Sequence, residues 1–106
     1  MSLDFLVRKT EKIVETAFLW LRILKILKHR PYYMSELRRA LNPVPHMYTF
    51  QLNLYFMERL GLVAKERRGR VAVYSITPKG VEILERATNH LKKHVEYLLD
   101  GDEAHM

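Results

Sequence analysis

The chain contains no cysteine and only four glycines and four prolines among its 106 residues. Without cysteine it can form neither a disulfide framework nor a zinc site built on thiolates. The glycines are isolated, so no glycine-rich loop is available to hold a phosphate group. Its three serines lack the sharp turn of a catalytic serine. We therefore expect a protein that is not an enzyme, uses no cofactor and has no metal site.

Long apolar runs are also missing. The most apolar stretch, residues 17–27, is short and contains Arg22 and Lys25, whereas a membrane-spanning helix needs about 20 apolar residues. The first residues, MSLDFLVRKTEK, lack the apolar core of a secretory signal. We therefore expect a soluble, cytoplasmic protein that does not enter a membrane.

Acidic residues are scarce except near the C-terminus. Residues 1–80 carry 15 Lys and Arg against 6 Asp and Glu, a net charge of +9, whereas residues 81–106 carry 3 against 6, a net charge of −3. A basic body with an acidic end suits a phosphate backbone that contacts one end only. An ordinary basic surface in solvent explains the same charges, so the charge pattern leaves both interpretations open.

A long helix is predicted for residues 3–29, which contain no glycine or proline. Ser2 can cap its start, and Arg30-Pro31 ends it. Its apolar stripe follows a spacing of three and four residues and consists of Leu3, Leu6, Ile13, Ala17, Trp20, Leu24 and Leu27. From residue 17 onward it is apolar nearly all round, so a partner chain is a reasonable cover for one side.

Two shorter helices are predicted next, separated by the rigid loop Asn42-Pro43-Val44-Pro45. The first covers residues 34–41, after a short extended segment, with Ser35 as a candidate cap. The second covers residues 45–60, with Pro45 near its first turn and Gly61 as its C-cap. Its buried face is marked by Phe50, Leu54 and Met57.

Two strands and a last helix complete the chain. Residues 62–66 and 71–76 are strand-like, and Arg67-Arg68-Gly69-Arg70 is predicted to form the hairpin tip. Thr77 then caps a helix over residues 78–100 that Gly101 ends, with a frayed tail over residues 101–106. The helix carries a three-heptad seam of Val81, Leu84, Thr88, Leu91, Val95 and Leu98.

This order of elements resembles the winged-helix domain of PadR-like and MarR-like transcription regulators. The matching pieces are ILKHRPYYMSELRRAL, FQLNLYFMERLGLVAKE and VYSITPKGVEIL, the last similar to the ending Y-x-L-T-x-x-G of those families. The long terminal helices are similar to those of small archaeal winged-helix proteins that pair through a coiled coil. The resemblance implies a mainly α fold with a small β-hairpin, in one domain over residues 1–100.

In such domains the third helix lies in the major groove and the hairpin wing touches phosphates. Carried over, the resemblance implies that Gln51 pairs with adenine, that Tyr48 and Thr49 reach a phosphate or a thymine methyl, and that the wing arginines contact the backbone. The full set of candidate DNA-binding residues is Ser35, Arg38, Arg39, Tyr48, Thr49, Gln51, Leu52, Tyr55, Arg59, Arg67, Arg68 and Arg70.

Each of these candidates has an alternative interpretation. The aromatic third-helix face, which has no Lys or Arg before Arg59, can instead pack against the first helix, a second chain or a protein partner. The wing arginines can form an ordinary turn in solvent, and Arg38 and Arg39 can lie on a solvated face.

The terminal helices predict a homodimer. The candidate interface residues are Leu3, Leu6, Ile13, Trp20, Leu84, Thr88, Leu91, Val95 and Leu98. The seam of the last helix can also pack within its own chain, and which terminal helix forms the interface stays open. His90 and His94 lie one helical turn apart, as two metal ligands do, but surface histidines are the better interpretation because no third ligand is evident.

The sequence therefore predicts a homodimer that binds double-stranded DNA, as a transcription regulator or as an architectural, nucleoid-associated protein. Two copies would place their third helices roughly 34 Å apart on the duplex. The alternative function is a protein interaction module that uses the aromatic third-helix face. A third possibility is single-strand binding, with tyrosines stacked on bases. The sequence names no operator and no small-molecule effector.

Overall fold

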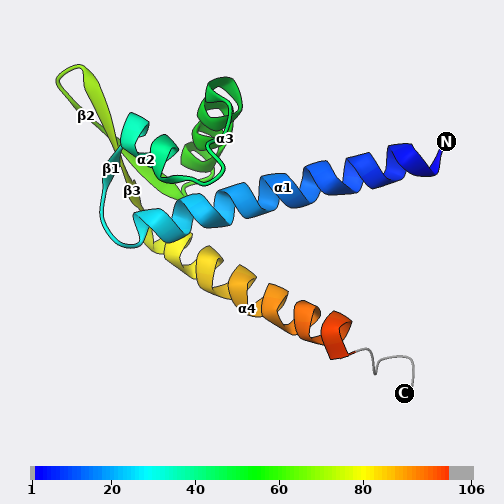
Figure 1. Ribbon diagram of the computed structural model, residues 1–106. Helices are drawn as coiled ribbons and strands as arrows, with labels where there is room; N and C mark the ends of the chain where they lie inside the picture. Colours follow the sequence, from blue (N-terminus) through cyan, green and yellow to red (C-terminus); the bar gives the residue numbers. More distant parts are fainter. Residues whose placement is uncertain (1, 101–106) are drawn as a thin grey trace.

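The computed structural model describes residues 2–100 and consists of four helices and a small sheet (Figure 1). The elements in chain order are α1 Leu3–Leu27, β1 Tyr32–Tyr33, α2 Met34–Ala40, α3 Met47–Arg59, β2 Val63–Arg68, β3 Val71–Ile76 and α4 Pro78–Asp100. The helix end expected at Gly101 and the tail expected over residues 101–106 lie outside the described residues. Every predicted element is present, and the predicted class, mainly helical with a β-hairpin, is confirmed.

One predicted cap and one predicted helix start are wrong, whereas α2 begins at Met34 as predicted. Ser35 does not cap α2, because the cap position belongs to Tyr33, whose N–H donates to the Glu36 carboxylate at 3.0 Å. Pro45 lies outside α3, which begins after His46; the His46 Nδ1 accepts from the Tyr48 N–H at 3.3 Å. At both helix starts, a side chain accepts a hydrogen bond from a backbone N–H group that has no partner within the helix.

The three strands form an antiparallel sheet in the order β1-β3-β2. Arg68 pairs with Val71, so the turn between β2 and β3 is the dipeptide Gly69-Arg70 rather than the four-residue tip that the sequence predicted. Gly69 has a φ of +66°. A positive φ at the first turn position suits a type II′ turn, which matches the twist of the two strands. We call the β2–β3 hairpin the wing.

The core lies where α2, α3 and the sheet meet the second half of α1 and the start of α4. Its fully buried members include the predicted Phe50, Leu54 and Met57. At the junction of β3 and α4, the Thr77 hydroxyl donates to the Gly61 carbonyl at 2.6 Å and accepts from the Gly80 N–H at 3.0 Å. Gly80 is buried, and a side chain there would collide with the Leu62 carbonyl. These contacts fix the direction in which α4 leaves the domain.

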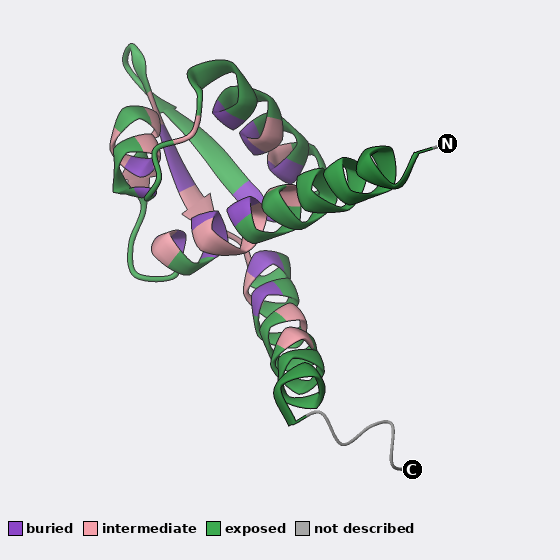
Figure 2. Cartoon of the chain, turned by 45° about the vertical axis from the view of Figure 1, so that its right-hand side comes forward, coloured by how far each residue is buried: buried purple, intermediate pink, exposed green. Residues whose placement is uncertain are grey.

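The ends of α1 and α4 project from the core in different directions (Figures 1 and 2). Residues 3–15 of α1 and residues 92–100 of α4 are exposed throughout, and we call these two segments the arms. Of the apolar stripe predicted for α1, Leu24 and Leu27 are buried and Trp20 is half-buried. Within the described residues, no helix is both long enough and apolar enough to cross a membrane.

Candidate nucleic-acid interface

The helix α3 has one face in the core and the opposite face in solvent. Its outward face, spaced i, i+3, i+4 and i+7, consists of Tyr48, Gln51, Leu52 and Tyr55. Tyr48 is 67% exposed and Tyr55 is 54% exposed, and Arg59 continues the same face into the last turn. Because opposite faces of a helix cannot both pack on one core, burial of Phe50, Leu54 and Met57 makes this exposure unavoidable.

One hydrogen bond joins α1 to α3, and a second within α3 orients the amide that accepts it. The Trp20 Nε1–H donates to the Asn53 Oδ1 at 2.8 Å, and the Asn53 Nδ2 donates to the Thr49 carbonyl at 2.8 Å. Thr49 is therefore on the flank that faces α1, where it lines a hollow with Phe18 and Arg22. Thr49 is exposed, but it lies beside the outward face rather than on it.

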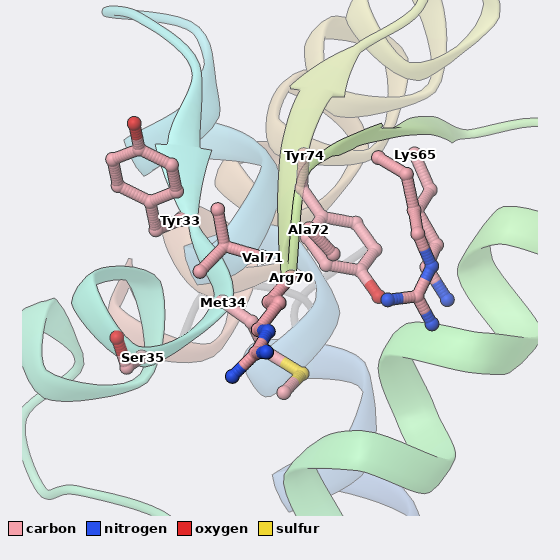
Figure 3. A pocket seen from close by; sticks show the side chains of 9 residues that line it. Tyr33, Met34, Ser35, Lys65, Arg70, Val71, Ala72 and Tyr74 are labelled. Carbon is pink, nitrogen blue, oxygen red and sulfur yellow. The ribbon is translucent and has the colours of Figure 1, made fainter.

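Side-chain alternation along β2 places two cations of the wing on the same face of the sheet. Lys65 and Arg67 lie on the same face of β2 as the buried Val63, because side chains alternate along a strand. Lys65 pairs with Tyr74 of β3 across the sheet. With Arg70 from the turn they line a hollow of about 310 Å³ between the wing and the start of α2 (Figure 3). The residues that line this hollow are Tyr33, Met34, Ser35, Lys65, Arg67, Arg70, Val71, Ala72 and Tyr74, and none is acidic.

The three predicted wing arginines are thus not equivalent. Arg67 and Arg70 line the hollow, whereas Arg68 lies on the opposite face and its guanidinium is 3.4 Å from the Glu66 carboxylate. Lys65, which the sequence analysis did not select, belongs to the cluster. The strand predicted over residues 62–66 ends before Arg67, whereas β2 continues to Arg68 and so places Lys65 and Arg67 two residues apart in one strand.

The two candidate arginines of α2 also differ. The Arg38 Nε–H donates to the Pro45 carbonyl at 2.9 Å, so this side chain braces the loop that leads into α3. Arg39 is exposed, and no ion pair holds it among residues 2–100. Ser35 is exposed and lines the same hollow as Lys65.

Tyr74 contributes a neutral hydroxyl beside these cations. Burial raises the pKa of Tyr74, the charge of Glu58 on α3 raises it further, and Arg67 acts in the opposite direction. A raised phenol pKa keeps the proton on the oxygen at neutral pH, so Tyr74 remains a hydrogen-bond donor. The hollow therefore presents amine, guanidinium and hydroxyl donors, the groups that bind phosphate oxygens.

The two histidines of α4 face one another outside this site. The Nε2 atoms of His90 and His94 are 3.2 Å apart, and both rings are exposed. The part of the chain that the structure describes holds no group of three or more residues that could bind a metal ion.

No family model and no curated protein sequence matches the chain. Solved structures do match, and the shared fold covers most of both chains. A transcriptional regulator from Clostridium thermocellum has a TM-score of 0.75 at 14% identity, over 84% of this chain and 96% of that one. The transcriptional regulator BldR from Sulfolobus solfataricus has a TM-score of 0.68 at 22% identity, over 97% and 88%. RosR from H. salinarum has a TM-score of 0.62 at 20% identity, over 82% and 93%. The chain therefore has the winged-helix fold of transcriptional regulators, as its sequence predicted.

Proposed function

We propose that this chain binds double-stranded DNA as a homodimer and regulates transcription. In this proposal the outward face of α3 enters the major groove and the wing contacts the phosphate backbone. The observation that carries the proposal is the hollow that Lys65, Arg67 and Arg70 line and that has no acidic residue in its lining, in a domain whose α3 keeps one face free for bases. The fold shared with transcriptional regulators supports the same function.

The distribution of ion pairs supports the wing as the backbone contact. Four cations outside the hollow are paired with carboxylates, as Lys28–Glu85, Arg30–Glu36, Arg68–Glu66 and Arg86–Glu82. None of the three cations in the hollow has such a partner among the described residues. Unpaired cations gathered in one place can neutralise phosphates, and the release of the counterions condensed on the DNA then favours binding.

The remaining candidate residues take roles according to their positions. Tyr48, Gln51, Leu52 and Tyr55 face the bases, and Arg59 reaches a phosphate from the last turn of α3. Arg39 and Ser35 extend the backbone contact from α2. Arg38, Arg68 and Thr49 are secondary, because Arg38 and Arg68 have partners within the chain and Thr49 faces α1.

The exposed arms support the homodimer. Ile13 is 65% exposed on α1, and Leu98 and Leu99 are each 80% exposed on α4. Large apolar side chains gathered on projecting helices mark an interaction surface in a protein of this size. Of the seam residues, Leu84 is buried and Leu91 is half-buried. The later seam residues, Val95 and Leu98, are exposed in a single chain. The arms of a second copy of the chain would cover these exposed residues.

The first test measures binding to duplex DNA, single-stranded DNA and RNA over a salt series by fluorescence anisotropy. In a dimer, the three wing cations of each chain alone contribute about −5 to the slope of log affinity against log salt, and the contacts of Arg39 and Arg59 make the slope steeper. Duplex affinity should then fall by at least about a thousandfold between roughly 50 and 200 mM salt. Tighter binding to single strands than to duplex, or a slope near zero, would contradict the proposal.

Sedimentation of charge variants tests the dimer. The unaltered chain should sediment as a dimer. Val95→Glu with Leu98→Glu should raise the dissociation constant about a hundredfold or more, because each buried aliphatic side chain contributes about 1.5–3 kcal/mol. Lys92→Gln serves as the control on the same arm. Leu6→Glu with Ile13→Glu makes the matching test of α1. A chain that is monomeric at every concentration rules out the homodimer.

One observation favours a second candidate function. Tyr55 and Phe56 are adjacent exposed aromatic residues of α3, with ring centroids 5.9 Å apart, and such pairs are common at protein interfaces. The face of α3 would then dock a protein instead of bases. This alternative predicts that Gln51→Ala and Tyr55→Ala weaken capture of that partner and leave duplex affinity unchanged.

A further inference from the structure

The chemistry of the outward face of α3 points to a class of DNA sequence. In the major groove, guanine presents two acceptors, which Arg and Lys recognise, and cytosine presents a donor, which Asp and Glu recognise. The face carries no charged residue from Tyr48 to Tyr55. Arg59 is the first cation, and it stands one turn beyond Tyr55, at the end of the helix. The face therefore lacks the groups that distinguish a G·C pair.

An amide on the same face suits adenine. Adenine offers one acceptor and one donor side by side, and a Gln or Asn side chain can pair with both. The two amides of α3 differ in this respect. Asn53 uses its oxygen on Trp20 and its nitrogen on Thr49, whereas Gln51 is exposed and has no hydrogen-bond partner among residues 2–100. Gln51 is thus the amide that can face a base.

The apolar neighbours of Gln51 suit thymine. Thymine alone among the four bases carries a methyl group in the major groove, and apolar side chains contact it. Tyr48 and Leu52 flank Gln51 on the outward face, and Tyr55 lies one turn beyond it. Leu52 is 39% exposed and Tyr55 is 54% exposed, so both have surface to bury against a methyl group.

We infer that α3 selects A·T base pairs, with Gln51 on adenine and Leu52, Tyr48 and Tyr55 on thymine methyl groups. This inference rests on the proposed function and adds to it the class of target sequence. The wing supplies affinity for any duplex, and α3 supplies the preference. The two contributions are separable, because the first depends on salt and the second on the bases.

The test uses the full chain and three duplexes of one length at one salt concentration. The first is A·T-rich, the second is the same sequence with uracil in place of thymine, and the third is G·C-rich. Uracil removes only the methyl group from the major groove and leaves the minor-groove pattern unchanged. We expect a loss of about fourfold for each contacted methyl. We expect a further loss of about tenfold or more on the G·C-rich duplex.

Substitutions in α3 test which side chains produce the preference for A·T base pairs. Gln51→Ala should reduce the ratio of A·T to G·C affinity by about tenfold. Leu52→Ala and Tyr55→Ala should each reduce the difference between the thymine and uracil duplexes, and adding Tyr48→Ala to both should remove it. Tyr97→Ala is the matched control, since Tyr97 is equally exposed, at 57%, but lies on α4. It should change neither ratio.

The outcomes separate this inference from the proposed function. Equal affinity for all three duplexes, with a steep salt dependence retained, overturns the A·T preference and leaves duplex binding intact. A preference for A·T that changes neither on uracil substitution nor in Gln51→Ala also overturns it, because the minor groove would then be the surface recognised. Failure to bind any duplex at low salt overturns both proposals.

Discussion

Replacing Lys65 and Arg67 together by glutamine is expected to weaken duplex binding by at least about sixtyfold at about 0.1 M salt. Each phosphate contact contributes about 0.9 to the slope of log affinity against log salt, so the loss of two contacts lowers the slope by about 1.8 for each chain. Glutamine keeps most of the stem of each side chain, so the sheet should remain folded. Anisotropy titrations over the salt series measure both quantities.

Two control variants make this result specific to the hollow. Lys92→Gln with Lys93→Gln removes the same charge from α4 and should leave the slope nearly unchanged. Arg68→Gln removes a neighbouring wing cation that faces Glu66 on the other side of the sheet, and should reduce affinity far less than Arg67→Gln. If Arg68→Gln equals or exceeds Arg67→Gln, the assignment of the wing face is wrong.

Phe50→Ala should have the largest effect on stability. Phe50 is fully buried near the start of α3, and truncating a buried phenylalanine costs about 3–5 kcal/mol. For a domain of this size such a loss lowers the melting temperature by more than about 10 °C. Thermal unfolding followed by circular dichroism measures the change at one fixed protein concentration. Phe50→Leu gives a milder substitute if the alanine variant does not fold.

The same helix provides the control for this stability effect. Phe56 is 45% exposed, so Phe56→Ala removes the same side chain from the solvent side of α3. We expect its free energy of unfolding to change by less than about 1 kcal/mol. Similar losses for the two variants would mean that the assigned core face and free face of α3 are wrong.

The faces of α3 were predictable from sequence because they follow from local periodicity. Phe50, Leu54 and Met57 are spaced as one side of a helix, and Gly61 has the positive φ, +79°, that a helix C-terminus commonly requires. The strand runs and the Thr77 cap are equally local signals. These features need no knowledge of distant parts of the chain.

Contacts between distant residues were not predictable in this way. The pairing of β1 with β3 joins Tyr32 to Tyr74 across 42 positions, and no local pattern specifies it. The apolar pattern of α1 continues at Ile13, although the domain covers only the second half of that helix. Periodicity identifies a surface that needs cover, but it does not say whether the same chain provides it.

The candidate site shows the same division. The sequence indicates which residues could bind DNA. Which of them are free to do so depends on their hydrogen bonds and ion pairs within the folded chain. In sequence, Arg38 and Arg68 are equivalent to their neighbours Arg39 and Arg67. In the structure, Arg38 binds the Pro45 carbonyl and Arg68 pairs with the Glu66 carboxylate. Proximity to Gly69 identifies the arginines of the tip but not Lys65, which belongs with Arg67 through side-chain alternation along β2.

Because side chains alternate along β2, the charge that the wing presents to the hollow depends on which residues occupy the odd positions of the strand. Lys65 and Arg67 occupy odd positions, whereas Glu66 and Arg68 occupy even ones and neutralise each other. Since a shift of one residue turns every side chain of a strand to the opposite face, a single insertion between Val63 and Lys65 would exchange the two sets. The overall composition of the hairpin would barely change, yet the β2 side chains that face the hollow would carry no net charge, which leaves Arg70 of the turn as the cation there.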